Sequence, residues 1–184
     1  ILAASIMSLS LQALAADKAL LIGVGEHQDA RNNLPGIDLD ITSMKQAAKL
    51  LGFNNIKTLE NSQATESNIK KQLRWLTKGV GKDDRVLLYF SGHGSQMRDR
   101  NGDEADRLDE FLVAYDFGVT GNTPRGYILD DDLNRALSKI PSRNVYVVVD
   151  ACQSGTSTKS VAPYLGVSEA MPKYLKYVGM PQDA

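Results

Sequence analysis

Three short apolar runs stand out along the chain, because polar residues do not alternate with the apolar ones inside them. They cover residues 19–24, 86–90 and 145–149. Continuous apolar runs of this length are typical of strands that are buried on both faces, as in a parallel sheet. A weaker run over residues 56–59 predicts one further strand.

Helical patterns lie between these runs. Apolar residues at three- and four-residue spacing predict helices over residues 38–51, 66–78 and 131–139, and Thr65 is a candidate N-cap of the second helix. The alternation of strands and helices predicts an α/β fold, a doubly wound, mostly parallel sheet flanked by helices. Residues 91–126 show neither pattern, and we expect them to form a long irregular segment that is functional or disordered.

Composition limits the classes of function. The 184 residues carry 21 Lys and Arg against 22 Asp and Glu, so the formal net charge is -1 and no global positive charge favours nucleic acid as a partner. With 42% hydrophobic residues, the chain has the composition of a packed globular protein rather than a disordered or fibrous one. Its single cysteine, Cys152, excludes an internal disulfide.

The amino terminus has the character of a targeting segment. Residues 1–16 are uncharged and apolar and include Ala13-Leu14-Ala15, the small-x-small spacing of a signal-peptidase site. We interpret them as the remnant of a secretory signal peptide, which predicts a secreted or periplasmic protein; a buried helix is the alternative. The run is shorter than the ~20 residues that a bilayer requires, so no stable membrane span is expected.

The residues that follow the predicted strands carry candidate chemistry, because ligands of open α/β sheets bind beyond the carboxyl ends of the strands. Two such places hold the motifs Ser91-Gly92-His93-Gly94 and Asp150-Ala151-Cys152-Gln153-Ser154-Gly155. A Cys–His pair is the minimum for thiol nucleophilic catalysis, since the imidazole raises the thiolate fraction. We therefore predict that Cys152 and His93 are catalytic and that the backbone N–H groups of Gly94 and Cys152 hold the oxyanion.

Other sites receive less support from the same residues. A small buried cysteine and a hydrogen-bonded loop histidine with no joint role are the alternative to a catalytic pair. Zinc is poorly supported, because His27 is far from His93 in sequence and the ligand-pair spacing is lacking. Gly23-Val24-Gly25 is followed by Gln28 at the third glycine position of a dinucleotide loop, so no organic cofactor is expected.

Several ordered motifs resemble those of one family. The segments from Tyr89 to Gln96 and from Asp150 to Gly155 resemble the His and Cys motifs of the caspase-like cysteine peptidases, specifically metacaspases and their bacterial relatives. Residues 102–110 resemble the acidic segment that metacaspases carry between those motifs. The resemblance implies a cysteine endopeptidase with a caspase-like catalytic, large-subunit-like domain, which we place at residues 17–160.

The resemblance also bears on specificity. Asp150 lies two residues before Cys152, so both are expected on one side of the strand end, where a carboxylate favours a basic substrate side chain. Caspases proper, which cut after Asp, have Gln in place of Asp150, whereas metacaspases resemble this sequence and cut after Arg or Lys. Asp40 matches the second acid of that pocket; a carboxylate favoured by the helix dipole is the alternative for it. The expected partners are peptides or proteins with Arg or Lys at the cleavage site.

Calcium is implied less clearly. Asp109, Asp130 and Asp131 match three of the places where metacaspases hold Ca²⁺, but Lys159 stands at the fourth. Lysine removes a hard oxygen ligand and adds a positive charge, so the site is expected to be weakened, rebuilt or absent. Helix-cap acids and a solvated acidic loop are the alternative.

The stretch after Cys152 is short and shows no convincing pair of further strands. Caspase-like domains complete their sheet and substrate cleft with a smaller carboxyl-terminal portion. We interpret residues 161–184 as a tail or linker towards such a small-subunit-like portion. The rival function is a non-catalytic binding or scaffold domain that lacks the second wall of the cleft; a flavodoxin-like ligand-binding domain has the right layout but does not account for the paired motifs.

Overall fold

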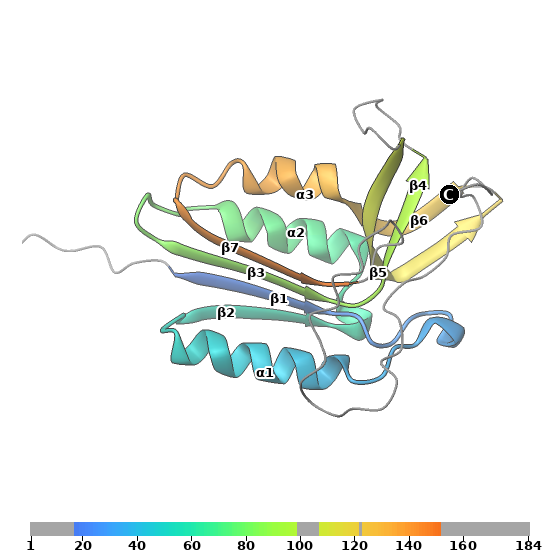
Figure 1. Ribbon diagram of the computed structural model, residues 1–184, viewed down its shortest axis with the longest axis horizontal. Helices are drawn as coiled ribbons and strands as arrows, with labels where there is room; N and C mark the ends of the chain where they lie inside the picture. The colour runs from blue at the N-terminus through green and yellow to red at the C-terminus, as the bar shows by residue number, and fades with distance from the viewer. Residues whose placement is uncertain (1–16, 99–106, 122, 152–184) are drawn as a thin grey trace, which may run out of the picture.

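A parallel sheet of four strands lies at the centre of the molecule, in the order β2-β1-β3-β7 (Figure 1). The computed structural model describes residues 17–98, 107–121 and 123–151, so the expectations for residues 1–16 and 161–184 lie outside the described residues. Its strands are β1 (Lys18–Gly23), β2 (Asn55–Glu60), β3 (Arg85–Ser91) and β7 (Asn144–Asp150). All three strand pairs are parallel, which confirms the four strands predicted from the apolar runs.

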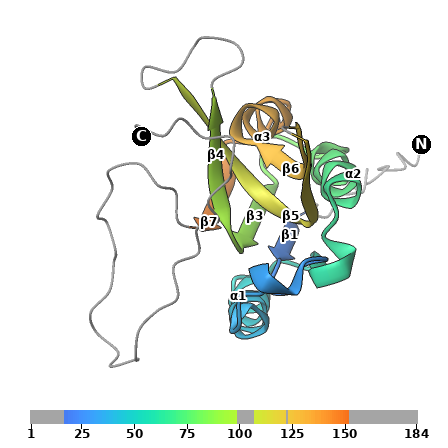
Figure 2. The same ribbon diagram turned by 90° about the vertical axis from the view of Figure 1, so that its right-hand side faces the viewer.

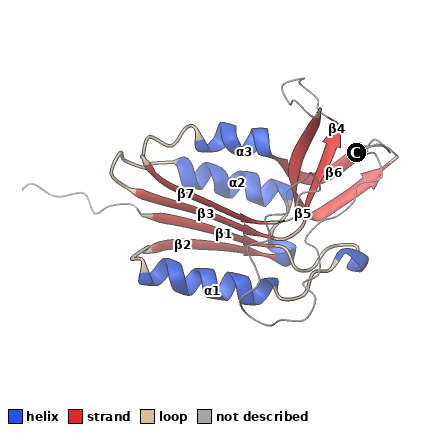
Figure 3. Cartoon of the chain, in the orientation of Figure 1, coloured by secondary structure: helices blue, strands red, loops and turns tan. Residues whose placement is uncertain are grey.

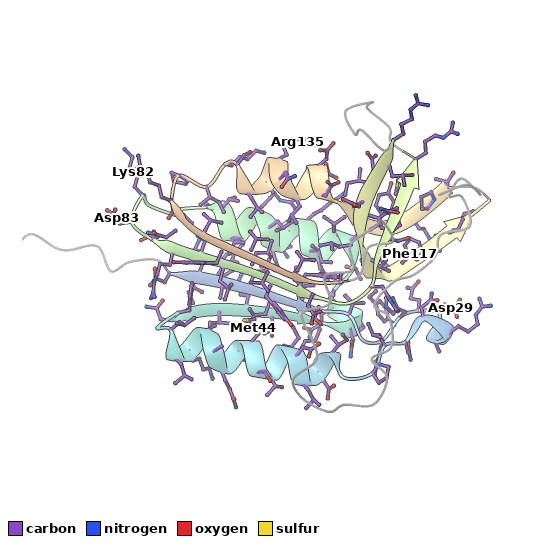
Figure 4. All side chains as sticks on the ribbon, in the orientation of Figure 1. Asp29, Met44, Lys82, Asp83, Phe117 and Arg135 are labelled. Carbon is purple, nitrogen blue, oxygen red and sulfur yellow. The ribbon has the colours of Figure 1, made fainter. Side chains whose placement is uncertain are left out.

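Helices cover both faces of this sheet. α1 (Ile37–Leu50) lies on one face, and α2 (Glu66–Thr77) and α3 (Asp130–Leu137) lie on the other, as Figure 2 shows with the sheet between them. Neighbouring residues of β1 point to opposite faces: Ala19 and Leu21 belong to the core on the α1 side, whereas Leu20 and Ile22 belong to the core on the α2 side. Figure 4 shows Met44 on the sheet-facing side of α1. The doubly wound α/β architecture is thus confirmed.

Local chemistry sets where the helices begin. The Thr65 hydroxyl accepts a hydrogen bond from the Asn68 N–H at 3.3 Å, which confirms Thr65 as the N-cap of α2. The Asp116 carboxylate accepts a second bond from the Glu66 N–H at 2.9 Å and thereby joins this helix to β5 (Leu108–Thr120). α1 follows Gly36, whose φ of 96° lies in the left-handed region that favours glycine.

The expectation that residues 91–126 form an irregular segment is wrong. They contain β4 (Gly94–Arg98), β5 and the start of β6 (Thr123–Leu129). These strands form an antiparallel sheet in the order β4-β5-β6, which stands against one end of the parallel sheet (Figure 3).

Burial on both sides explains why the sequence pattern does not reveal this sheet. Leu112 and Ala114 of β5 belong to the core under α2 and α3, whereas Phe111 and Val113 form a separate cluster with Met97 of β4. The strand therefore has a continuous apolar run rather than an alternating pattern, and the charged residues before it obscure that run. The partners that stabilise it are distant in sequence, so no local pattern reveals the pairing.

The first described residue, Asp17, is held in place through its own buried carboxylate. Asp17 accepts hydrogen bonds from the backbone N–H of Arg85 at 2.7 Å and from its guanidinium at 2.6 and 2.9 Å. These bonds from Arg85 hold the pKa of Asp17 below its usual range. They join the amino ends of β1 and β3.

Among the helices of residues 17–98, 107–121 and 123–151, none combines the length and apolar character needed to cross a membrane.

The hairpin of β5 and β6 makes a steric demand that can be tested. Gly126 has a φ of 71°, and a Cβ at this position would overlap the backbone of Asp116 and Phe117. We expect Gly126→Ala to lower the free energy of unfolding by roughly 2–4 kcal/mol, because left-handed strain and overpacking add. Urea unfolding followed by circular dichroism measures this.

Gly79→Ala is the matched control, since Gly79 has a φ of 68° but a Cβ there would meet nothing within 4 Å. It should cost only about 1 kcal/mol, the left-handed strain alone. Equal losses in the two variants would show that the close approach at Gly126 is unimportant.

Candidate active site

His93 lies at the carboxyl edge of the parallel sheet, in the turn between β3 and β4. Its ring is buried, and its Nε2 is 3.0 Å from the backbone carbonyl oxygen of Asn32. A carbonyl oxygen only accepts hydrogen bonds, so Nε2 carries the proton and the neutral ring keeps its lone pair on Nδ1. The geometry therefore makes Nδ1 the basic nitrogen.

The backbone around His93 is fixed on three sides. The Gly92 N–H donates to the Asp150 carbonyl at 3.3 Å, and the Val113 N–H of β5 donates to the His93 carbonyl at 3.0 Å. The Val24 N–H donates to the Ser91 carbonyl at 2.9 Å. A Cβ on Gly92 would lie only 3.1 Å from the Phe90 ring, which explains why glycine precedes the histidine.

The loop between β1 and α1 supplies the Asn32 carbonyl. Residues Ala30–Asn32 form a short 3-10 helix that the Asp29 side chain caps through the Arg31 N–H. Figure 4 shows Asp29 on the outer side of this loop, away from the sheet. The Asn33 side chain accepts a hydrogen bond from the His27 N–H at 2.9 Å. The loop is therefore internally braced.

His27 lies beside His93, although the two are far apart in sequence. Their ring centroids are 5.5 Å apart with an interplanar angle of 34°. His27 is only 7% exposed, and within the described part of the chain neither of its ring nitrogens makes a hydrogen bond of normal geometry. Burial, and next the charge of His93, lower the pKa of His27 to about 4, against weaker opposing effects of the Ala114 backbone and Asp29. His27 is therefore neutral near pH 7.

The two predicted pocket acids come together at Ser91. The Ser91 hydroxyl donates to Asp40 Oδ2 at 2.8 Å, and Ser91 is the in-register partner of Asp150 on β7. Residues in register on parallel neighbours point to the same face, and Tyr89, two residues before Ser91, packs on the α1 side. Asp40 and Asp150 thus both lie on the α1 side of the carboxyl edge, next to the turn that carries His93.

The structure describes only some of the other predicted site residues. Gly94 begins β4 directly after His93. Cys152 and Lys159 lie outside the described residues, since the description of this part of the chain ends at Ala151. The nucleophile and the oxyanion donors therefore stay predictions.

The predicted calcium ligands lie on two elements. Asp109 is buried on β5, and Asp130 and Asp131 begin α3, where the helix dipole favours carboxylates. Two steps beyond the antiparallel pair of Phe111 and Leu129, the same register would set Asp109 opposite Asp131. Within the part of the chain that the structure describes, however, no group of three or more His, Cys, Asp or Glu residues could hold a metal ion. Asp109, Asp130 and Asp131 do not form such a group among the described residues, and the calcium site stays a prediction.

Sequence reasoning missed three participants. The carbonyl of Asn32 has no side-chain signature, and His27 is close to His93 in space but not in sequence. Ser91 is a small polar residue, and its position at the end of a predicted strand was the only indication of a role in the site.

Comparison with known proteins identifies a common family. The metacaspase peptidase C14 domain profile matches residues 17–160. Metacaspase-3 of Arabidopsis thaliana is 36% identical over 150 residues, which cover 76% of this chain and 40% of that protein. Metacaspase-1 of Ajellomyces capsulatus is 29% identical over 167 residues, 85% of this chain and 45% of that protein. The chain thus spans less than half the length of these two relatives.

A solved structure gives the same picture. A protein from Geobacter sulfurreducens, known from its crystal structure, superimposes with a TM-score of 0.60 at 30% sequence identity. The match covers 76% of this chain and 52% of that one.

The lowered pKa of His27 predicts acid sensitivity of the fold. The unfolded imidazole binds its proton near pH 6.5 and the folded one only near pH 4, so between these values the unfolded state holds more protons. The stabilising contribution of neutral His27 is thus present above pH 6.5 and is lost as the pH falls to about 4. At ~1.4 kcal/mol per pKa unit, the loss is about 3 kcal/mol.

His27→Gln should remove this part of the pH dependence, because glutamine does not titrate. Urea unfolding of both proteins at pH 7 and pH 4.5 checks the expectation, with the difference between the two pH values smaller in the variant. The same pH dependence in both proteins would show that His27 is not the responsible group.

Proposed function

The chain belongs to the metacaspase family of C14 cysteine peptidases, and on this premise we propose that it is an endopeptidase that cleaves after Arg or Lys through Cys152 and His93. The observation that carries the proposal is the pair of carboxylates, Asp40 and Asp150, next to Ser91 and the His93 turn. The non-catalytic scaffold is the alternative, and the experiment below separates the two.

The acid pair supports basic specificity on electrostatic grounds. Two carboxylates on one side of the sheet edge attract a guanidinium or ammonium group and repel the side chain of a substrate Asp. An Arg side chain brings a planar set of donors that matches carboxylate oxygens. The hydroxyl of Ser91 orients the Asp40 carboxylate by donating to its Oδ2.

The proposed reaction uses His93 first as a base and then as an acid. Nδ1 of His93 takes the proton of the Cys152 thiol, and the thiolate attacks the peptide carbonyl. The N–H groups of Gly94 and Cys152 hold the oxyanion of the tetrahedral intermediate. The protonated ring then gives its proton to the leaving amine, and water hydrolyses the resulting thioester. The Asn32 carbonyl favours the imidazolium because it accepts a hydrogen bond from the Nε2–H.

The edge of the sheet supports a further part of the proposal. Among the described strands β7 is an edge strand, and Tyr146, Val147, Val148 and Val149 are 40–52% exposed. An exposed apolar edge offers unpaired backbone groups to another strand. We therefore place the small-subunit-like portion against β7, where it would extend the sheet and complete the substrate cleft.

We also propose a secreted or periplasmic location, on the basis of the signal-like character of residues 1–16.

Peptide hydrolysis by the full 184-residue chain tests the specificity. Fluorogenic peptides ending in Arg or Lys should be cleaved and those ending in Asp should not, with Cys152→Ala inactive. Asp150→Asn should lower kcat/KM for the Arg peptide about 30-fold or more, which corresponds to about 2 kcal/mol of lost charge pairing. Asp38→Asn, an exposed acid of the same helix as Asp40, is the control and should have little effect.

Each contrary result has a distinct meaning. Equal cleavage after Asp would refute the pocket assignment, and turnover by Cys152→Ala would refute the nucleophile. If the folded chain cleaves nothing, the same assay on a protein extended beyond residue 184 decides between two functions. Activity there would support the need for a second cleft wall, and inactivity there would support the scaffold.

If Lys159 disrupts the calcium site, added Ca²⁺ should have little effect on the turnover of peptides by this chain. Adding Ca²⁺ to the chelator-treated protein should change turnover less than about two-fold, whereas Lys159→Asp should create a Ca²⁺ response by supplying a fourth oxygen ligand to Asp109, Asp130 and Asp131. Isothermal titration with Ca²⁺ measures the binding itself. Lys173→Asp adds the same charge elsewhere and should not respond. Strong activation of the unmodified chain would contradict the role given to Lys159.

A further inference from the structure

The only two histidines of the chain form a buried pair at the sheet edge. His27 and His93 are 7% and 6% exposed, with their ring centroids 5.5 Å apart. We propose that His27 is a positioning residue for His93: its neutral ring packs against the His93 imidazole and holds it in the orientation in which Nε2 meets the Asn32 carbonyl. The inference rests on the proposed function, because it assigns a task to the environment of the catalytic base.

One short loop contacts the His93 ring in two ways. The Asn32 carbonyl meets Nε2 at 3.0 Å, and His27, five residues earlier, lies against the ring itself. The His27 ring, which lies against the imidazole, restricts rotation of His93 about its Nε2 hydrogen bond. Productive geometry depends on such restriction, since a misplacement of about 1 Å can cost on the order of 10²-fold in rate.

His27 is itself held firmly enough to act in this way. Its N–H donates to the Asn33 side chain at 2.9 Å. The next residue, Gln28, donates from its N–H to the Tyr115 carbonyl of β5 at 3.1 Å. The backbone of His27 is therefore fixed both to its own loop and to the antiparallel sheet, and the burial of its ring restricts the other rotamers.

The neutral state of His27 is part of the inference. The groups that act on its charge are His93 in the turn after β3, the Ala114 backbone of β5, and Asp29 in its own loop. Burial and His93 disfavour the cation, and the other two groups favour it less strongly. A positive charge at this place would oppose the imidazolium that His93 must become during the reaction. A neutral ring fills the space without that cost.

Three variants separate packing from a general loss of structure. His27→Phe keeps an uncharged ring, whereas His27→Ala removes the ring and admits water beside His93. Glu26→Gln changes the exposed neighbouring residue and is the control. We expect His27→Ala to lower kcat by about 10- to 100-fold with KM nearly unchanged. His27→Phe should restore kcat to within a few-fold of the unmodified chain.

NMR titration of the imidazole signals gives a readout that needs no substrate. Each His27 variant leaves His93 as its only histidine, so one imidazole signal reports on it. The midpoint of this signal should lie at higher pH in His27→Ala than in His27→Phe, because water stabilises the imidazolium. The acid limb of kcat/KM should move in the same direction.

The outcomes separate this inference from the proposed function. Identical His93 midpoints in the Ala and Phe variants would overturn the positioning role, whether or not peptides are cleaved. So would a kcat of His27→Phe as low as that of His27→Ala. A clear midpoint difference in a chain that cleaves nothing, even when it is extended beyond residue 184, would uphold the positioning of His93 while refuting the peptidase.

Discussion

The parallel pairing of β3 with β7 is the constraint on which the site depends. The pairing runs in register from Arg85 and Asn144 to Ser91 and Asp150. It continues for one step into the turn, where the Gly92 N–H donates to the Asp150 carbonyl. A shift of one residue would turn Asp150 to the face opposite Asp40 and would separate the two acids. The same register therefore brings Asp150 next to Ser91, which bonds to Asp40, and places the His93 turn beside the end of β7.

The antiparallel sheet gives this edge an environment that the parallel sheet alone would lack. β5 bonds to both histidine-bearing segments, through Val113 to the His93 carbonyl and through Tyr115 to Gln28. Both imidazoles are almost fully buried where these segments meet, so little water reaches the pair. Exclusion of water disfavours charge on His27 and strengthens the interaction of His93 with the Asn32 carbonyl. The burial that lowers the stability of the fold in acid, through His27, also keeps the His27 ring packed against His93.

Sequence patterns predicted the elements whose signal is local. β1, β3 and β7 carry long apolar runs, and Thr65 caps α2 through its own side chain. The helix that carries Asp40 was predicted from its apolar spacing, whereas the assignment of Asp40 to a pocket came from the family resemblance. β5 has a similar apolar run, but charged neighbours obscure it and its pairing depends on distant strands. The Asn32 carbonyl and the contact of His27 with His93 depend on how a loop folds back, which residue types alone do not encode.

The acid pair links the structural cost of the site to its proposed selectivity. Asp40 and Asp150 lie on one face of the edge, where two ionised carboxylates repel each other in the absence of a cation. The Ser91 hydroxyl offsets part of this repulsion by donating to Asp40. A bound guanidinium would offset more, whereas a third carboxylate would add to it. In the proposed function, selection between substrates would follow from this repulsion, because a basic side chain relieves it and an acidic one increases it.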